Sequence, residues 1–145
     1  MNRFAALLLS GLLLAPFLAA AQAGPLVVQN AWMRKAPGAD SAAVYLVLRN
    51  AGVKTVVVNG VRSPVATHVM IHETSTTEGQ SHMRAYDRLV IPPGKSVAFE
   101  PGGLHIMLSG FTSSVTVGQT VPLVLQLSDG STVAAAAVVR PVDAQ

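Results

Sequence analysis

The sequence predicts an all-β domain built as an antiparallel β-sandwich or barrel. Runs of Val, Ile, Leu and Thr, each long enough for one strand, recur between clusters of Gly, Pro and Asn, which is the pattern of strands joined by tight turns. No segment after residue 23 repeats its apolar residues with the period of a helix. Short strands with regular turns favour a sandwich or a barrel.

In the first half of the domain, aliphatic runs end at the turn signals Pro37-Gly38 and Asn50-Ala51-Gly52. Val, Thr and Leu dominate these runs, and such residues fit a pleated, half-buried surface. The strands predicted here are Leu26–Arg34, Ala42–Asn50, Lys54–Arg62 and Ala66–Glu73.

In the second half, turns at Glu78-Gly79, Pro92-Pro93-Gly94, Pro101-Gly102-Gly103 and Asp129-Gly130 separate the apolar runs. The run Ala134–Ala137 is assigned to a strand, because it follows a tight turn and lies between two valines. The strands predicted here are Gln80–Tyr86, Ser96–Glu100, Leu104–Ser109, Val121–Leu127 and Thr132–Val139.

The first 23 residues have the pattern of a secretory signal peptide. Arg3 precedes an apolar run from Phe4 to Leu18, and Ala21-Gln22-Ala23 has the small-x-small pattern of a cleavage site. We expect cleavage after Ala23, export, and one folded domain over residues 24–145. A membrane anchor is the alternative, but Pro16 breaks the run before the roughly 20 apolar residues that a span requires. The chain has no Cys, so we expect neither disulfides nor a lipid-anchored Cys.

Composition and spacing argue against several classes of function. The formal net charge of +3 at pH 7 is small and dispersed, so nucleic-acid binding is not expected. Glu73, Asp87 and Glu100 do not form a carboxylate pair with catalytic spacing, and the chain contains no Ser/His/Asp order or Gly-rich phosphate loop. We therefore expect no enzyme activity.

Two His and two Met residues form the pattern His72-x10-Met83-x21-His105-x-Met107. Imidazole and thioether suit Cu(I), and the absence of a thiolate excludes a blue-copper electron carrier. In the last predicted segment of the pattern, Leu104, Ile106 and Leu108 take one parity. His105 and Met107 take the other parity, so they share the face away from the core.

The hairpin around Glu78-Gly79 is predicted to bring the other two candidates together. With its centre near Thr77-Glu78, His72 and Met83 would lie directly opposite each other. Cross-strand partners have Cβ atoms about 5 Å apart, which is close enough for both side chains to meet one ion. The alternative is that each Met fills space in the core and each His makes an ordinary hydrogen bond.

Neighbouring residues provide weaker candidates. Met70 and His68 share the parity of His72, and we expect Met70 to pack beneath the site rather than supply an auxiliary sulfur. His82 points to the face opposite Met83 and is left out of the site. Trp32 and Tyr45 are expected to be core aromatics, although either would also be able to shield the copper.

The motif and its context resemble the periplasmic PCuAC copper-chaperone family. This resemblance implies a cupredoxin-like (immunoglobulin-like) β-barrel that binds Cu(I) through His72, Met83, His105 and Met107. Two departures stand out: Thr74 occupies a position where family members often have Met, and residues 140–145 lack the His- and Met-rich tail of some members. The matching segments are Ala31-Trp32 with Arg34, Ala42–Leu46 with Arg49-Asn50, and the whole stretch from Ile71 to Leu108, so the resemblance covers nearly all of residues 24–145.

The resemblance implies a periplasmic carrier of Cu(I) for the assembly of cytochrome oxidase copper centres, and we expect a monomer that binds one Cu(I). Its partner would be a thiol-containing acceptor, because thiolate binds Cu(I) more strongly than thioether does. No stable membrane insertion is expected. The alternatives are a secreted β-sandwich interaction module with incidental His and Met residues, and a module for copper storage or tolerance without transfer. A copper enzyme would normally need three His or a Cys and an open substrate position.

Overall fold

The computed structural model describes residues 24–143. Over this range the chain forms ten strands and no helix, which confirms the all-β prediction. The predicted signal peptide, residues 1–23, lies outside the described residues. The strands are β1 (Leu26–Arg34), β2 (Ser41–Asn50), β3 (Val56–Arg62), β4 (Ala66–Thr77), β5 (Gln80–Tyr86), β6 (Leu89–Ile91), β7 (Ser96–Phe99), β8 (Leu104–Phe111), β9 (Thr120–Leu127) and β10 (Thr132–Arg140).

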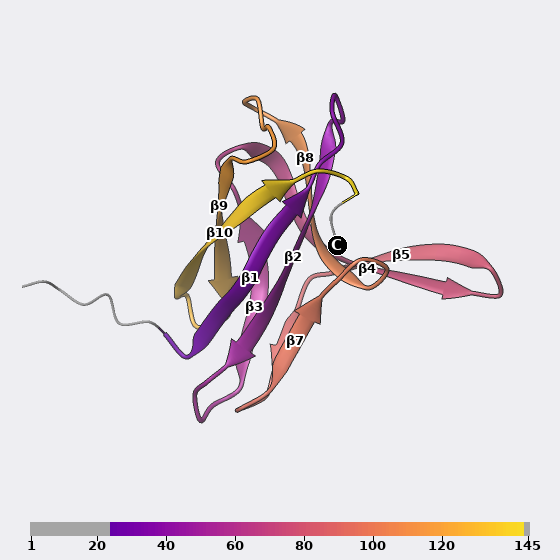
Figure 1. Ribbon diagram of the computed structural model, residues 1–145. Helices are drawn as coiled ribbons and strands as arrows, with labels where there is room; N and C mark the ends of the chain where they lie inside the picture. The colour runs from indigo at the N-terminus through magenta and orange to yellow at the C-terminus, as the bar shows by residue number, and fades with distance from the viewer. Residues whose placement is uncertain (1–23, 144–145) are drawn as a thin grey trace, which may run out of the picture.

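These strands form one sheet that curls around the core (Figure 1). Its order is β5-β4-β8-β2-β1-β10-β9-β3-β6, and β7 pairs with the part of β2 that β8 does not cover. The sheet curls enough for β3 to contact β4. All the described pairs are antiparallel, as predicted, except β1 with β10, which is parallel and makes the sheet mixed.

Most strand limits agree with the prediction to within one or two residues, and the more informative differences are the following. Strand β6 was not predicted, because a three-residue strand between turn residues is too short to show a period. The third strand begins at Val56 rather than at Lys54. Strand β4 continues beyond Glu73 to Thr77, because its polar end pairs with β5 instead of forming a loop.

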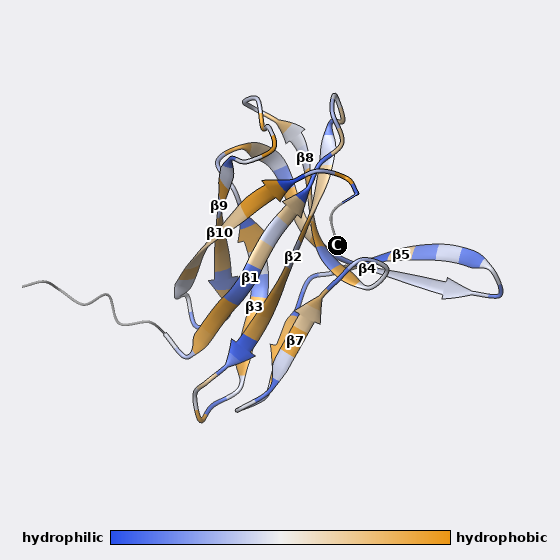
Figure 2. Ribbon diagram, in the orientation of Figure 1, coloured by the Kyte–Doolittle hydropathy of each residue, from blue (hydrophilic) through white to orange (hydrophobic). Residues whose placement is uncertain are grey.

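The core consists of the inward-facing residues, which alternate with outward-facing residues along each strand. Val44, Leu46 and Leu48 alternate along β2, and Leu123 and Leu125 alternate along β9, all fully buried. Each buried aliphatic side chain contributes about 1.5–3 kcal/mol to folding. Figure 2 shows the apolar residues concentrated along these strands. No helix long and apolar enough to cross a membrane occurs in residues 24–143.

The far half of the β4–β5 hairpin projects from the sheet (Figure 1). Its turn is Glu78-Gly79, with φ angles of 52° and 77°, as in the type I′ turns that match the twist of hairpin strands. Strand β5 is exposed except at half-buried Tyr86, and Figure 2 shows the projecting part as mostly polar. This arm, residues 75–84, is therefore held mainly by cross-strand pairing rather than by core packing.

Candidate metal centre

The two predicted histidine ligands lie directly opposite each other on neighbouring strands. His72 on β4 pairs with His105 on β8, and their ring centroids are 5.9 Å apart with the ring planes at 79°. A ring nitrogen lies about 1 Å from its centroid and a metal–imidazole bond is about 2 Å long, so two rings that share an ion can be roughly 6 Å apart. The observed spacing therefore permits one ion between the rings without movement of either strand.

One backbone carbonyl orients His105 and ties it to β4. The Gly103 oxygen accepts a hydrogen bond from His105 Nδ1 at 3.1 Å and another from the Thr74 N–H at 3.0 Å. Because a carbonyl only accepts, the proton of the neutral ring lies on Nδ1, and Nε2 keeps its lone pair for a metal. This role of Gly103 was not predicted. The available signal was its position two residues before a candidate ligand.

His72 presents a nitrogen that the described protein leaves without a partner. The ring is half-buried, and its Nδ1 is shielded from solvent but makes no hydrogen bond. A buried, unpaired ring nitrogen is uncommon and fits a position for a bound ion. Burial, followed by the charge of His105, lowers the pKa of His72 below its ordinary 6.5. The ring is therefore neutral at pH 7, as metal binding requires.

Met107 and Met83 flank His72 on opposite sides. Met107 lies on β8, two residues beyond the partner of His72, and Met83 lies on β5 opposite Thr74. Each is thus a diagonal neighbour of His72 on the same face. Diagonal neighbours have Cα atoms roughly 7–8 Å apart, which long side chains can bridge.

The predicted direct pairing of His72 with Met83 is wrong. His72 pairs with Ala85, because the two-residue turn places the centre of the hairpin one residue later than expected. A shift of this kind moves each partner by two residues, so the face is unchanged. Met83 is therefore still on the side of His72, but it lies further out along the arm and is 58% exposed.

Three neighbours of the site have different roles. Met70 does not pack beneath the site as expected: it is 46% exposed and pairs directly with Met107. His68 is exposed, and its Nδ1 is 2.9 Å from the hydroxyl of Thr67. His82 pairs with Ser75, so it lies on the face of the hairpin opposite the ligand candidates, in agreement with its exclusion from the site.

Trp32 and Tyr45 are buried, but they do not belong to the core cluster. Their rings are in contact in a tilted arrangement, with centroids 4.8 Å apart and ring planes at 46°. The Arg34 guanidinium lies 5.5 Å from the Trp32 centroid and 5.3 Å from that of Tyr45, and Arg140 lies 5.1 Å from Trp32. The prediction that both aromatic side chains are buried is confirmed, although they lie outside the main core cluster and arginine side chains cover their rings.

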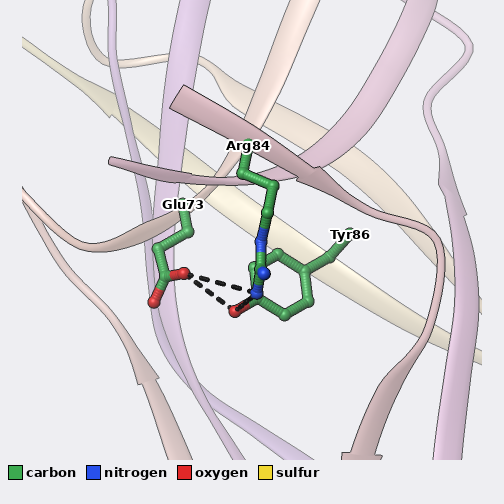
Figure 3. Close-up of polar contacts among 3 residues, drawn as sticks. All are labelled: Glu73, Arg84 and Tyr86. Carbon is green, nitrogen blue, oxygen red and sulfur yellow. Dashed lines mark hydrogen bonds and ion pairs between the residues drawn. The ribbon is translucent and has the colours of Figure 1, made fainter. Parts of the chain in front are cut away.

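A group of three side chains braces the base of the arm on the face opposite the ligands. The Tyr86 hydroxyl donates to Glu73 Oε2 at 2.8 Å, and Arg84 donates to that hydroxyl while its guanidinium lies 3.8 Å from the carboxylate. Figure 3 shows Glu73 and Arg84 converging on the phenol oxygen. In sequence Glu73 is adjacent to His72 and Arg84 to Met83, so the brace fixes the strands beside both ligand positions. This brace was not predicted. The sequence feature that could have indicated it is that Glu73, Arg84 and Tyr86 alternate with the ligand candidates and so share the opposite face of the hairpin.

The available donors determine which ion the site would suit. In residues 24–143 no group of three or more His, Cys, Asp or Glu residues is arranged to hold a metal. An ion between the two imidazoles would therefore rely on thioether sulfur. This donor set suits Cu(I), whereas Zn²⁺ in proteins is bound by His, Cys or carboxylate, and Ca²⁺ and Mg²⁺ by oxygen.

Comparisons with known proteins agree with this fold. The model of the family described as "Putative lipoprotein LpqE-like" matches residues 26–139. The chain belongs to the LpqE-like family. A relative, the "Putative lipoprotein Lxx21020" of Leifsonia xyli subsp. xyli, is 38% identical to this LpqE-like chain over 112 residues, which are 77% of the chain and 67% of the relative.

Solved PCuAC domains have the same fold as the LpqE-like chain, which confirms the resemblance seen in the motif. The solution structure of Cu(I)-DR1885 from Deinococcus radiodurans has a TM-score of 0.66 at 32% identity, covering 84% of this chain and 83% of DR1885. The copper-bound PCuAC domain from PmoF2 has a TM-score of 0.68 at 23% identity, covering 81% and 94%. This second likeness concerns the fold alone. None of these names describes an enzyme.

Proposed function

We propose that this LpqE-like chain is an exported copper chaperone that binds one Cu(I) and passes it to another protein. The observation that carries the proposal is the facing pair His72 and His105, with centroids 5.9 Å apart and with Met83 and Met107 beside it. These four residues are the proposed ligands. The Cu(I) form of DR1885, 32% identical to this chain, supports the same cargo here.

The donors favour carriage without catalysis. Cu(I) is a closed-shell ion with little geometric preference, so an incoming ligand can replace its donors one at a time. His105 keeps Nε2 available by donating Nδ1–H to Gly103, and the lowered pKa of His72 keeps that ring neutral. Thioethers do not titrate in the physiological range. The 58% exposed side chain of Met83 gives a partner access to the ion.

The proposal also covers location and acceptor. The signal-like residues 1–23 and the lipoprotein description of the family support export, and we propose a monomer in the periplasm. The proposed acceptor has a reduced Cys pair and takes part in the assembly of cytochrome oxidase copper centres. Transfer from thioether and imidazole to thiolate is downhill for Cu(I), so it needs no energy source.

A transfer experiment tests this function. The copper-loaded protein is mixed with an exported acceptor domain that carries a reduced Cys pair, the two are separated, and copper is measured in each fraction. Most of the copper should move to the acceptor and none to a matched acceptor with both Cys changed to Ser. Copper that stays with the loaded protein for hours would indicate storage instead of delivery.

A further inference from the structure

Met70 is a surface thioether whose role the four-residue motif does not explain. It is 46% exposed, which is unusual for a side chain that normally fills a core. Strand β5 ends at Tyr86, whose partner is Ile71, so the described ladder places no β5 residue beside Met70. The Met70 side chain is therefore partly open to solvent, in a hollow that Val61, Tyr86 and Asp87 also line.

The pairing of β4 with β8 places Met70 in a compact set of four donors. Met70 pairs with Met107, and His72 pairs with His105 two residues further along. The two pairs occupy successive positions on one face of the same two strands. Opposite residues have Cβ atoms about 5 Å apart, and residues two apart on a strand are separated by about 7 Å. One ion at the imidazole pair is thus within reach of both sulfurs.

Met83 reaches the imidazole pair from the other side. Met107 is a diagonal neighbour of His72 across the β8–β4 pair, and Met83 is a diagonal neighbour of His72 across the β4–β5 pair. Each step covers roughly 7–8 Å between Cα atoms, so in a flat sheet the two Met residues would be about 15 Å apart. The four-residue set therefore closes on one ion only when the arm bends toward the imidazole pair, whereas Met70 and Met107 lie beside that pair without such a movement.

We propose that Met70 is a copper ligand of this chain, and that it forms with Met107 a sulfur pair on the sheet side of His72 and His105. Met83, on the exposed arm, is then the exchangeable donor through which Cu(I) arrives and leaves. The proposal rests on the proposed copper function and assigns a fifth donor to that site.

Methyl NMR with Ag(I), a redox-stable mimic of Cu(I), tests this assignment directly. The exported protein is labelled at the methionine methyl groups, each signal is assigned from a Met→Leu variant, and Ag(I) is added up to one equivalent. The signals of Met70 and Met107 should shift together and reach a plateau at one equivalent. Met33, which is fully buried in the core, serves as the internal reference and should not shift.

The possible outcomes separate this proposal from the copper function. If Met83 and Met107 shift while Met70 does not, Met70 is not a ligand, although the protein still binds the metal. If none of the three shifts, both proposals fail.

Affinity measurement gives a second test. Met70→Leu keeps the size of the side chain but removes the sulfur, and should weaken Cu(I) binding roughly tenfold or more. Val90→Leu, at a side chain that is 49% exposed on β6, is the matched control and should leave affinity unchanged. Equal affinities for Met70→Leu and the unaltered protein would overturn the assignment.

Discussion

Replacing the two candidate histidine ligands should affect stability very differently, although we expect both changes to weaken Cu(I) binding. His105 is 7% exposed and donates a hydrogen bond. His105→Ala loses that bond, about 0.5–1.5 kcal/mol, and buried ring contacts worth about 1 kcal/mol more. The metal-free protein should be destabilised by about 2 kcal/mol, which lowers Tm by roughly 6–10 °C in a domain of this size.

His72→Ala should leave the metal-free protein almost as stable as before. The ring is half-buried, and its buried Nδ1 has no hydrogen-bond partner. Removing an unsatisfied polar atom recovers about 1 kcal/mol or more, which offsets a similar loss of packing. We expect Tm to change by less than about 3 °C.

The assay combines thermal melting of the metal-free variants with competition against a chromogenic Cu(I) chelator. Both variants should bind Cu(I) at least about tenfold more weakly, whereas His82→Ala, an exposed position outside the ligand face, should match the unaltered protein. Equal Tm losses in the two variants would refute the assigned hydrogen bonding. Undiminished affinity in His105→Ala would refute its role as a ligand.

Three further predictions concern pH, the brace and the turn. The pKa of His72 is lowered, and only the neutral ring binds metal. Protonation of His72 should therefore weaken Cu(I) binding only below pH 6.5, by up to about tenfold per pH unit. Competition titrations in which affinity drops between pH 8 and 7 would contradict this. Glu73→Gln should weaken the Glu73–Tyr86–Arg84 brace and reduce Cu(I) affinity a few-fold. Its Tm should change little, because partly exposed ion pairs contribute about 1 kcal/mol or less. Glu78→Gln at the tip of the arm removes the same charge and, as the control, should change neither Cu(I) affinity nor Tm. Gly79→Val forces a β-branched residue to a φ of 77° and should destabilise the arm by about 1–3 kcal/mol. Gly79→Asn should be tolerated. Equal rates of amide hydrogen exchange in the arms of the two variants would argue against the type I′ turn.

The sequence contained enough information for the faces of the strands but not for their pairing. Alternation in Leu104–Leu108 predicted that Ile106 and Leu108 face the core, and both are fully buried. This prediction succeeds because the period of a strand is local and needs no knowledge of its neighbours.

Register could not be predicted in the same way. The polar stretch between His72 and Met83 accommodates a turn centred at either of two adjacent points, and the choice decides whether Met83 or Ala85 faces His72. The pairing of β4 with β8, which brings Met70 to Met107, joins segments that are far apart in the chain. One sequence carries no signal for such a pairing, so the exposure of Met70 emerged only from the fold.

If the chain is the proposed copper carrier, the projecting arm gives an acceptor a way to distinguish the loaded protein from the empty one. Residues 75–84 are all exposed, and segments with so few buried contacts open locally at low free-energy cost. An ion that binds only the closed arm suppresses that opening by RT ln(1 + [L]/Kd), about 2.7 kcal/mol when free ligand is at 100 times Kd. Amide exchange in the arm would then slow about a hundredfold on loading. Under the proposed function, the stiffness of the arm would report bound copper, so a partner that contacts the arm would be able to distinguish the loaded protein before it contacts the metal.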